Sequence, residues 1–498
     1  MFPKKYLFPL LAFLVPLLVR VIPEVLMGQY LVGFDTMAYY VPTTTLWVHG
    51  GVSLLSFLAS APLLYTLTAG LTMASGSVLF ALKVLAPFLL GFLGLAIYGF
   101  ANRGLGWSPK KSIVPALIGT LYFVALRISW DAFREELALI FFFVVLILIV
   151  AKSGASDKFS WKRYAAFSVA LAAVVLSNQV VAVLVLGVLL FTVIHKLLRK
   201  NRGDAARLVV FALPAVLLFF AIFYLSPSVP EYRIIFGFPA TSDGWLALFG
   251  YTSYPAMLAS EAGFILYCFV PLLPLALLSV RRLKSFQMRC WVVLVLAAAF
   301  IPIVSPSDMR LLMLLTYPLA FYVAEGLSRL KMVNWKRFRV TLLRVGMIYL
   351  VVMTAVLSLG FMLMPPADPF PYFNTNIVNG YVYQIPSSML QNTISISDCH
   401  DTVNALQWLK DNMTRTGVLL THRVFYGWAL TTFNSQQLVM YEYDNPINAA
   451  SNATQEGYNQ IYLIWWINGQ GWEGQPTVSS SFHEIYQSGK IAIYQYEA

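Results

Sequence analysis

The sequence predicts an α-helical polytopic membrane protein of about eleven transmembrane helices, with a small extracytoplasmic α/β domain at its carboxyl end. Hydrophobic residues make up 59% of the chain, charged residues make up 11%, and the mean hydropathy is +0.71. Long uncharged stretches recur along residues 1–364, and such stretches are typical of helices that cross a bilayer. Residues 365–498 are instead polar and rich in Asn, Gln and Ser. We therefore expect two domains, residues 1–364 in the membrane and residues 365–498 outside it.

The distribution of basic residues predicts the orientation. The net charge is +12, but Lys and Arg fall in short loops between apolar stretches and not in one cluster, which argues against a nucleic-acid partner. With the amino terminus inside, 24 of the 34 Lys and Arg lie in inner loops or at the inner terminus. That bias is the positive-inside signature. It predicts a multi-pass plasma-membrane protein with a cytoplasmic amino terminus and an extracytoplasmic carboxyl domain.

The predicted spans are the apolar stretches that lie between basic inner loops and short outer turns. They cover residues 6–22, 78–100, 113–128, 137–150, 165–176, 180–194, 208–225, 262–280, 291–304, 310–326 and 345–364. Residues 54–73 are also apolar, but counting them as a span would put the basic residues after the second span outside. We expect this stretch to lie in the outer interface. Arg20, near the outer end of the first span, is expected to snorkel to the interface; the alternative is that it meets a substrate phosphate.

The polar carboxyl region shows both helical and strand patterns. Apolar residues repeat along one face of residues 398–412, which predicts a helix. Short apolar runs at 417–420, 438–441, 461–465 and 491–494 predict strands. Helical or loop material separates the first three runs, so we expect a small α/β domain. The three cysteines of the chain have neither a disulfide pattern nor metal-type spacing.

Asp35 is the first candidate site residue. It follows the first span in the run Gly33-Phe34-Asp35, where a helix that starts inside would deliver it to the outer face. A carboxylate beside low-dielectric surroundings is costly unless it has a function. The alternative is a solvated loop residue, because Gly-Phe-Asp is also turn chemistry.

Two further outer connections combine acids with arginine. Asp131, Arg134 and Glu135 lie between the third and fourth spans at spacings that would place them on one face of a helix start. Asp308 and Arg310 form a similar corner before the tenth span. Asp131 and Asp308 could each be only a helix cap. A carboxylate with two arginines suits a phosphorylated lipid, because Arg grips phosphate oxygens and a carboxylate takes a proton or holds a cation.

The chain resembles the GT-C membrane glycosyltransferases. Gly33-Phe34-Asp35 with Tyr39 is similar to their acidic motif, and Ala61-Pro62-Leu63-Leu64-Tyr65 is similar to their interfacial helix. Trp130–Glu135 and Asp308–Leu312 resemble their later outer connections. The resemblance implies transfer of a sugar from a polyprenyl-phosphate donor to a lipid, glycan or protein acceptor at the outer face of the membrane.

The resemblance also implies roles for individual residues. Asp35 would be the catalytic base, or the carboxylate that holds a divalent cation such as Mg²⁺ or Mn²⁺. Arg134 and Arg310 would bind phosphate. The full set of substrate-binding candidates is Tyr39, Asp131, Arg134, Glu135, Asp308 and Arg310.

Two features depart from known GT-C enzymes. Asp35-Thr36 stands where protein mannosyltransferases carry an adjacent acidic pair. Residues 421–428 keep only Tyr426-Gly427 of the Trp-Trp-Asp-Tyr-Gly motif of oligosaccharyltransferases. The second departure argues against a sequon-reading oligosaccharyltransferase.

Two other function classes remain open. A transporter or lipid flippase would also be polytopic, but would more often show charges at mid-membrane and a two-fold repeat. A membrane scaffold that presents the carboxyl domain would not need acids and arginines at its outer connections.

Overall fold

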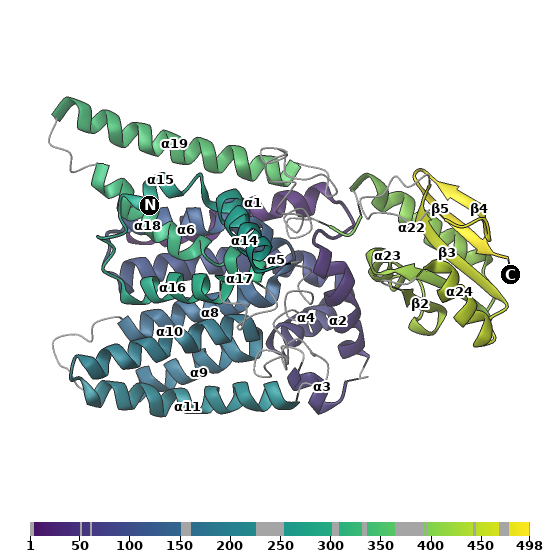
Figure 1. Ribbon diagram of the computed structural model, residues 1–498, viewed down its shortest axis with the longest axis horizontal. Helices are drawn as coiled ribbons and strands as arrows, with labels where there is room; N and C mark the ends of the chain where they lie inside the picture. Colours follow the sequence, from purple (N-terminus) through teal and green to yellow (C-terminus); the bar gives the residue numbers. More distant parts are fainter. Residues whose placement is uncertain are drawn as a thin grey trace.

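The computed structural model of the chain describes residues 4–49, 52–59, 62–150, 161–225, 253–300, 308–330, 336–363, 392–394, 396–441, 445–467 and 478–497. A helical bundle precedes a domain built on a five-stranded sheet. Figure 1 places the two at opposite ends of the long axis of the molecule.

Helices lying roughly side by side form the bundle (Figure 1). They are α1 Lys4–Leu26, α5 Val78–Gly99, α6 Pro109–Leu121, α7 Phe123–Asp131, α8 Phe133–Val150, α9 Trp161–Ser177, α10 Gln179–Leu198, α11 Arg202–Leu225, α14 Tyr254–Phe269, α16 Phe286–Phe300, α18 Thr316–Leu330 and α19 Lys336–Leu363. Every predicted span overlaps one of these helices. Polar caps set some of their starts: Ser77 accepts from the Phe80 amide at α5, and Asn178 accepts from the Val181 amide at α10.

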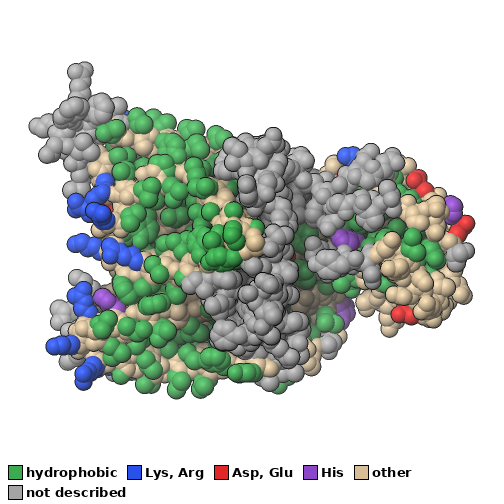
Figure 2. Space-filling view, viewed as in Figure 1, with side chains coloured by type: hydrophobic (Ala, Val, Ile, Leu, Met, Phe, Trp, Pro, Cys, Tyr) green, Lys and Arg blue, Asp and Glu red, His purple; other side chains and the backbone are tan. Residues whose placement is uncertain are grey.

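Several of these helices are long and apolar enough to cross a membrane. Within the part of the chain that the structure describes there are six, and the α6–α7 pair, bent by 56°, makes a seventh if it counts as one span. The predicted total of eleven spans stays a prediction. In Figure 2, Lys and Arg side chains gather at the end of the bundle away from the sheet domain, and hydrophobic side chains cover its flank. If the sheet domain lies outside the cell, the positive-inside rule predicts basic residues at the opposite end of the bundle, and this is where they are found.

Glycines allow some helices of the bundle to approach closely. A Cβ added to Gly94 of α5 would lie 2.2 Å from the Ala12 carbonyl oxygen of α1. One added to Gly326 of α18 would lie 2.0 Å from the carbonyl oxygen of Leu275, in the short helix α15 (Leu273–Leu277). Small residues at such contacts are the usual means of packing helices in a membrane.

Short helices cover the end of the bundle nearest the sheet domain. They are η1 Thr36–Tyr40, α2 Val41–Val48, α3 Leu54–Ala59 and α4 Pro62–Ser75. The 14 residues of α4 span about 21 Å, which is less than the hydrocarbon core of a bilayer. The stretch at 54–73 is therefore two short helices and not one spanning helix. Its location in the outer interface stays a prediction.

The carboxyl domain is a mixed sheet flanked by helices, as predicted. Its strands are β1 Gly417–His422, β2 Leu438–Tyr441, β3 Gln460–Trp466, β4 Phe482–Ser488 and β5 Ile491–Tyr496, and its longer helices are α22 Ile396–Asn412 and α24 Pro446–Gln455. The strand order is β2-β1-β3-β5-β4, with the first three parallel and the last two antiparallel to their neighbours. The interior strand β1 is buried along its whole length, which explains its continuous apolar sequence.

Strand β4 was not among the predicted strands. It lies at the edge of the sheet and exposes most of its side chains, so its sequence is polar. Its turn into β5 uses Gly489 at φ +54°, where a Cβ would meet the Asp401 carboxylate at 1.9 Å. Only glycine fits this turn, and the Ser488 hydroxyl donates to the same carboxylate at 3.0 Å.

The sheet domain contacts the bundle through the first outer connection. The short helix α23 (Arg423–Ala429) packs against η1. The Asn392 amide donates to the Leu31 carbonyl at 3.1 Å, and the Tyr30 hydroxyl lies 3.3 Å from His400 Nδ1. The ring of Tyr30 also meets Trp428 at 5.7 Å. The predicted domain boundary after residue 364 lies outside the described residues.

Candidate active site

Asp35 lies in the first outer connection, directly before η1. The chain enters this helix through Gly33 at φ +104°, a conformation that favours glycine. The Lys83 ammonium donates to the Tyr30 carbonyl on one side of the loop, and the Thr36 hydroxyl donates to the Trp130 carbonyl at 3.3 Å on the other. The loop is therefore held by two other helices, and the Asp35 side chain is only 5% exposed.

Arg310 joins Asp35 to Glu135. It comes from the short helix α17 (Asp308–Met313), and its Nη2 lies 2.9 Å from Asp35 Oδ2 while its Nη1 lies 3.8 Å from Glu135 Oε1. The Glu135 side chain is 9% exposed, whereas that of Arg310 is 44% exposed. The three outer connections thus meet in one set, in which an accessible guanidinium covers two buried carboxylates.

A second arginine and two tyrosines extend this set. The Arg134 guanidinium lies 5.9 Å from the ring centre of Tyr40, and its Nε is buried without a hydrogen-bond partner in the described structure. Tyr40 also faces Tyr65 of α4 edge-on at 6.2 Å. Burial raises the pKa of Tyr40 and of Tyr65, so both hydroxyls stay protonated and can donate.

Sequence reasoning did not single out Tyr40 or Tyr65 as site residues. The available signal was the pair Tyr39-Tyr40 after the acidic motif and the tyrosine that ends the run Ala61–Tyr65. The resemblance points to Tyr39 as a substrate-binding residue. The side chain of Tyr39 is half exposed, whereas that of Tyr40 is fully buried beside Arg134.

The helix-start interpretation of residues 131–136 is wrong. Asp131 is the last residue of α7 and Phe133 begins α8, with Ala132 at φ −94° and ψ 51° between them. Asp131 therefore neither caps α8 nor shares a helical face with Glu135. The spacing argument assumes one continuous helix. No proline or glycine in this stretch indicates that the helix is interrupted at Ala132. Glu135 and Glu136 do lie in the first turn of α8, where acids are favoured.

Two of the predicted residues are placed by their backbone alone. Asp131 ends α7 and Asp308 begins α17, two residues before Arg310. Their side chains lie outside the described part of the structure.

Arg20 does not snorkel, and that prediction is wrong. The residue is fully buried, with Nη1 2.6 Å from Glu24 Oε1 and Nε donating to the Ser129 carbonyl at 3.1 Å. Its guanidinium lies 4.7 Å from the Trp130 ring centre, and Lys83 Nζ approaches Glu24 Oε2 at 3.7 Å. Neighbouring elements enclose this end of α1. The Arg20 side chain therefore pairs with Glu24 inside the protein and does not reach the membrane interface. This buried group supports the segment that carries Trp130 and, through it, Thr36.

The described residues do not form a ready site for Mg²⁺ or Mn²⁺. Among them, no three acidic, His or Cys side chains gather at metal-binding distance. The guanidinium of Arg310 already occupies the position between Asp35 and Glu135 in which a cation would be shared.

The chain resembles known proteins in its three-dimensional structure. The sequence matches no protein-family model and no curated protein. The crystal structure of ArnT from Cupriavidus metallidurans bound to undecaprenyl phosphate superposes with a TM-score of 0.54, at 13% identity, over 97% of both chains. The apo structure of the same protein gives a TM-score of 0.50 at 14% identity and equal coverage. The chain therefore shares the fold of ArnT.

Proposed function

We propose that the protein is a glycosyltransferase that moves a sugar from a polyprenyl-phosphate carrier to an acceptor at the outer membrane face. The observation that carries the proposal is the set of Asp35, Glu135 and Arg310, brought together from three separate outer connections. The shared fold with ArnT, which was solved with undecaprenyl phosphate bound, supports a carrier of the same chemical class.

Arg310 is suited to bind the phosphate of the donor. Its side chain is the accessible member of the set, and a guanidinium can grip two phosphate oxygens at once. A polyprenyl chain stays in the bilayer, so its phosphate reaches the protein at the membrane surface, where the outer connections lie. Arg134 offers a second positive charge behind Tyr40, and the two arginines would stabilise the charge that collects on the departing phosphate.

Asp35 is suited to act as the base. As the acceptor hydroxyl oxygen forms its bond to the anomeric carbon, its proton passes to Asp35, and the bond between that carbon and the phosphate oxygen breaks. Polyprenyl phosphate leaves with the electron pair. In the structure Asp35 is paired with Arg310; when Arg310 turns to the donor phosphate, the carboxylate becomes available to take the proton. Glu135, at the other side of Arg310, would keep the guanidinium close to both positions.

The sheet domain is suited to form one wall of the path by which the acceptor reaches Asp35. Helix α23 packs against η1, and the segment before Asp35 is bonded to Asn392 of the domain. An acceptor that approaches Asp35 from outside would therefore pass beside this domain.

Substitution of Asp35 tests the proposal. Purified protein is mixed with a polyprenyl-phosphate sugar, and sugar release from the lipid is measured. Asp35→Asn keeps the size of the side chain and removes its charge, so turnover should fall about 10²-fold or more, while donor lipid still binds through Arg310. Asp411→Asn, on the exposed face of α22, is the matched control and should leave the rate unchanged.

Two outcomes would contradict this account. Full activity of Asp35→Asn would remove the base and, with it, the catalytic assignment. A chelator is expected to leave the wild-type rate unchanged, because Arg310 supplies the positive charge between the acids. A loss that Mg²⁺ or Mn²⁺ restores would instead assign Asp35 to holding a cation.

A further inference from the structure

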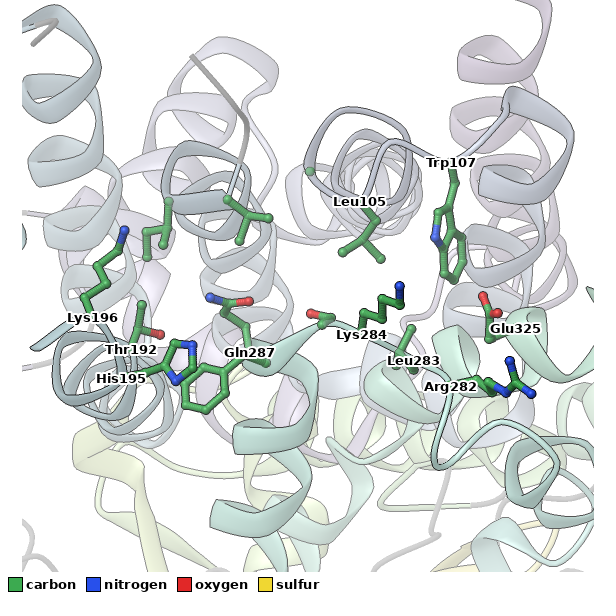
Figure 3. Close-up of a pocket in the computed structure, with 15 residues that line it drawn as sticks. Leu105, Trp107, Thr192, His195, Lys196, Arg282, Leu283, Lys284, Gln287 and Glu325 are labelled. Atoms are coloured by element: carbon green, nitrogen blue, oxygen red, sulfur yellow. The ribbon is translucent and has the colours of Figure 1, made fainter. Parts of the chain in front are cut away.

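A second concave site lies at the other end of the bundle. It is a cavity of about 510 Å³ between the ends of α8 and α10, the turn after α5, and the connection that leads into α16 (Figure 3). Ile149 and Val150 line it, whereas Glu135 of the same helix α8 lies in the candidate active site. Ile149 lies 14 positions after Glu135 in this helix, a distance of about 21 Å along its axis. The cavity is therefore separate from the Asp35 site.

The charge in this cavity is positive and partly unpaired. Lys196 is held by Asp204 at 2.8 Å, and Glu325 is held by Lys111. No described carboxylate pairs with the other two cations that line the cavity, Arg282 and Lys284. Figure 3 shows Lys284 near the middle, with His195 and Lys196 to one side and Arg282 to the other. With Lys196 and Glu325 each paired, Arg282 and Lys284 leave two positive charges among the described side chains that line the cavity.

Part of the cavity wall is apolar. Leu105, Ile149 and Val150 line it on the bundle side, and Phe286 lies beneath the imidazole of His195 with ring centres 4.3 Å apart. Trp107 adds an indole ring whose centre lies 4.1 Å from the Lys111 ammonium. A ligand that fills this space would meet both unpaired cations and hydrocarbon. A small hydrophilic anion would satisfy only the cations.

We propose that this cavity binds the phosphate head group of an anionic membrane lipid in the cytoplasmic leaflet. Arg282 and Lys284 would neutralise the phosphate, and the apolar wall would receive the glycerol backbone and the first methylenes of the acyl chains. The predicted orientation puts this end of the bundle inside, where anionic lipids gather. A free phosphate shares the charge but not the apolar part, so the two sources can be told apart. The inference does not depend on the proposed enzymatic function.

Lipid binding to purified protein tests the inference. The protein is prepared in neutral detergent, and the binding of phosphatidylglycerol is measured by native mass spectrometry, with phosphatidylcholine for comparison. Phosphatidylglycerol should bind more tightly. Each removed cation should weaken it about fivefold, so the double variant Arg282→Gln/Lys284→Gln should lose about 25-fold. The matched control Arg199→Gln/Arg281→Gln removes two exposed cations that do not line the cavity and should bind as the wild type does.

Three results would overturn the proposal. The first is equal binding of phosphatidylcholine and phosphatidylglycerol. The second is unchanged lipid affinity in the double variant or, if that variant does not fold, in Lys284→Gln alone. The third is competition by inorganic phosphate at concentrations as low as those of the lipid, which would make the cavity a site for soluble phosphates.

Discussion

The two ends of the bundle hold charge in opposite ways. At the end that faces the sheet domain, Arg310 is accessible but already shared between two buried acids. At the opposite end, lysines pair with the acids near the cavity, and Arg282 and Lys284 have no acidic partner among the described residues. A phosphate that reaches Arg310 must displace a carboxylate and free it, while one that reaches Arg282 displaces no described carboxylate. The first arrangement suits turnover and the second suits lasting occupancy.

Cysteine labelling tests whether these two ends lie on opposite sides of the membrane. A cysteine replaces Ser480, which is exposed in the sheet domain, or Gly203, where an added Cβ meets no atom within 4 Å. In intact cells an impermeant maleimide should label Ser480→Cys and leave Gly203→Cys unlabelled until the cells are opened. The opposite pattern would invert the topology and place the candidate active site inside.

The native cysteines should not disturb this measurement. Cys268, Cys290 and Cys399 are all buried. Burial raises the pKa of the Cys399 thiol to about 12, so almost none of it is thiolate at neutral pH. Wild-type protein should therefore remain unlabelled, and any label on it would have to be subtracted.

Arg310→Ala should separate donor binding at the outer end from lipid binding at the inner end. Loss of a charged hydrogen-bond donor costs about 1.5–3 kcal/mol, so the affinity for polyprenyl phosphate should fall about 10- to 150-fold. Arg310→Lys should recover only part of this loss, because an ammonium cannot form the two parallel bonds. Equilibrium binding of labelled polyprenyl phosphate measures both variants. Asp411→Asn, on the exposed face of α22, is the control and should keep wild-type affinity for polyprenyl phosphate. Arg310→Ala should still bind phosphatidylglycerol, because it leaves Arg282 and Lys284 in place; an equal loss of that binding would mean that the two ends do not act separately.

Asn392→Ala should have a smaller effect than Arg310→Ala. It removes the bond to the Leu31 carbonyl, four residues before Asp35, and leaves that buried oxygen without its partner. A cost of about 1–3 kcal/mol is expected, seen as a lower melting temperature and a modest loss of turnover. Gln455→Ala, on the exposed side of α24, is the control. Unchanged stability and rate would show that the sheet domain does not help to position Asp35.

Much of the bundle could be predicted because its signal is local. The apolar length of each stretch and the caps at Ser77 and Asn178 depend on neighbours in sequence. The break at Ala132 could not be predicted, because no proline or glycine marks it. Trp130 and Phe133, on either side of it, are both buried. Strand β4 escaped notice because an edge strand has little to bury.

The candidate site could be predicted in its charges but not in its contacts. Excess acids and arginines at the outer connections identified Asp35, Glu135 and Arg310, and the structure brings these three together. The sequence does not indicate that Tyr40, and not Tyr39, lies next to Arg134. The two tyrosines are adjacent in η1, and only the helix geometry decides which of them points toward Arg134.

The pair of Arg20 and Glu24 also bears on how the chain enters the membrane during synthesis. Both belong to α1, one turn apart, so the helix carries its own counter-ion before α5 or α7 has been made. A lone arginine adds about 2.5–3.5 kcal/mol to the insertion of a helix when it lies at the centre of the bilayer, and a neutralising partner within the helix reduces this cost. Lys83 and the carbonyl of Ser129 arrive later and hold an already neutral segment. The first helix can therefore wait in the lipid for the rest of the bundle to assemble around it.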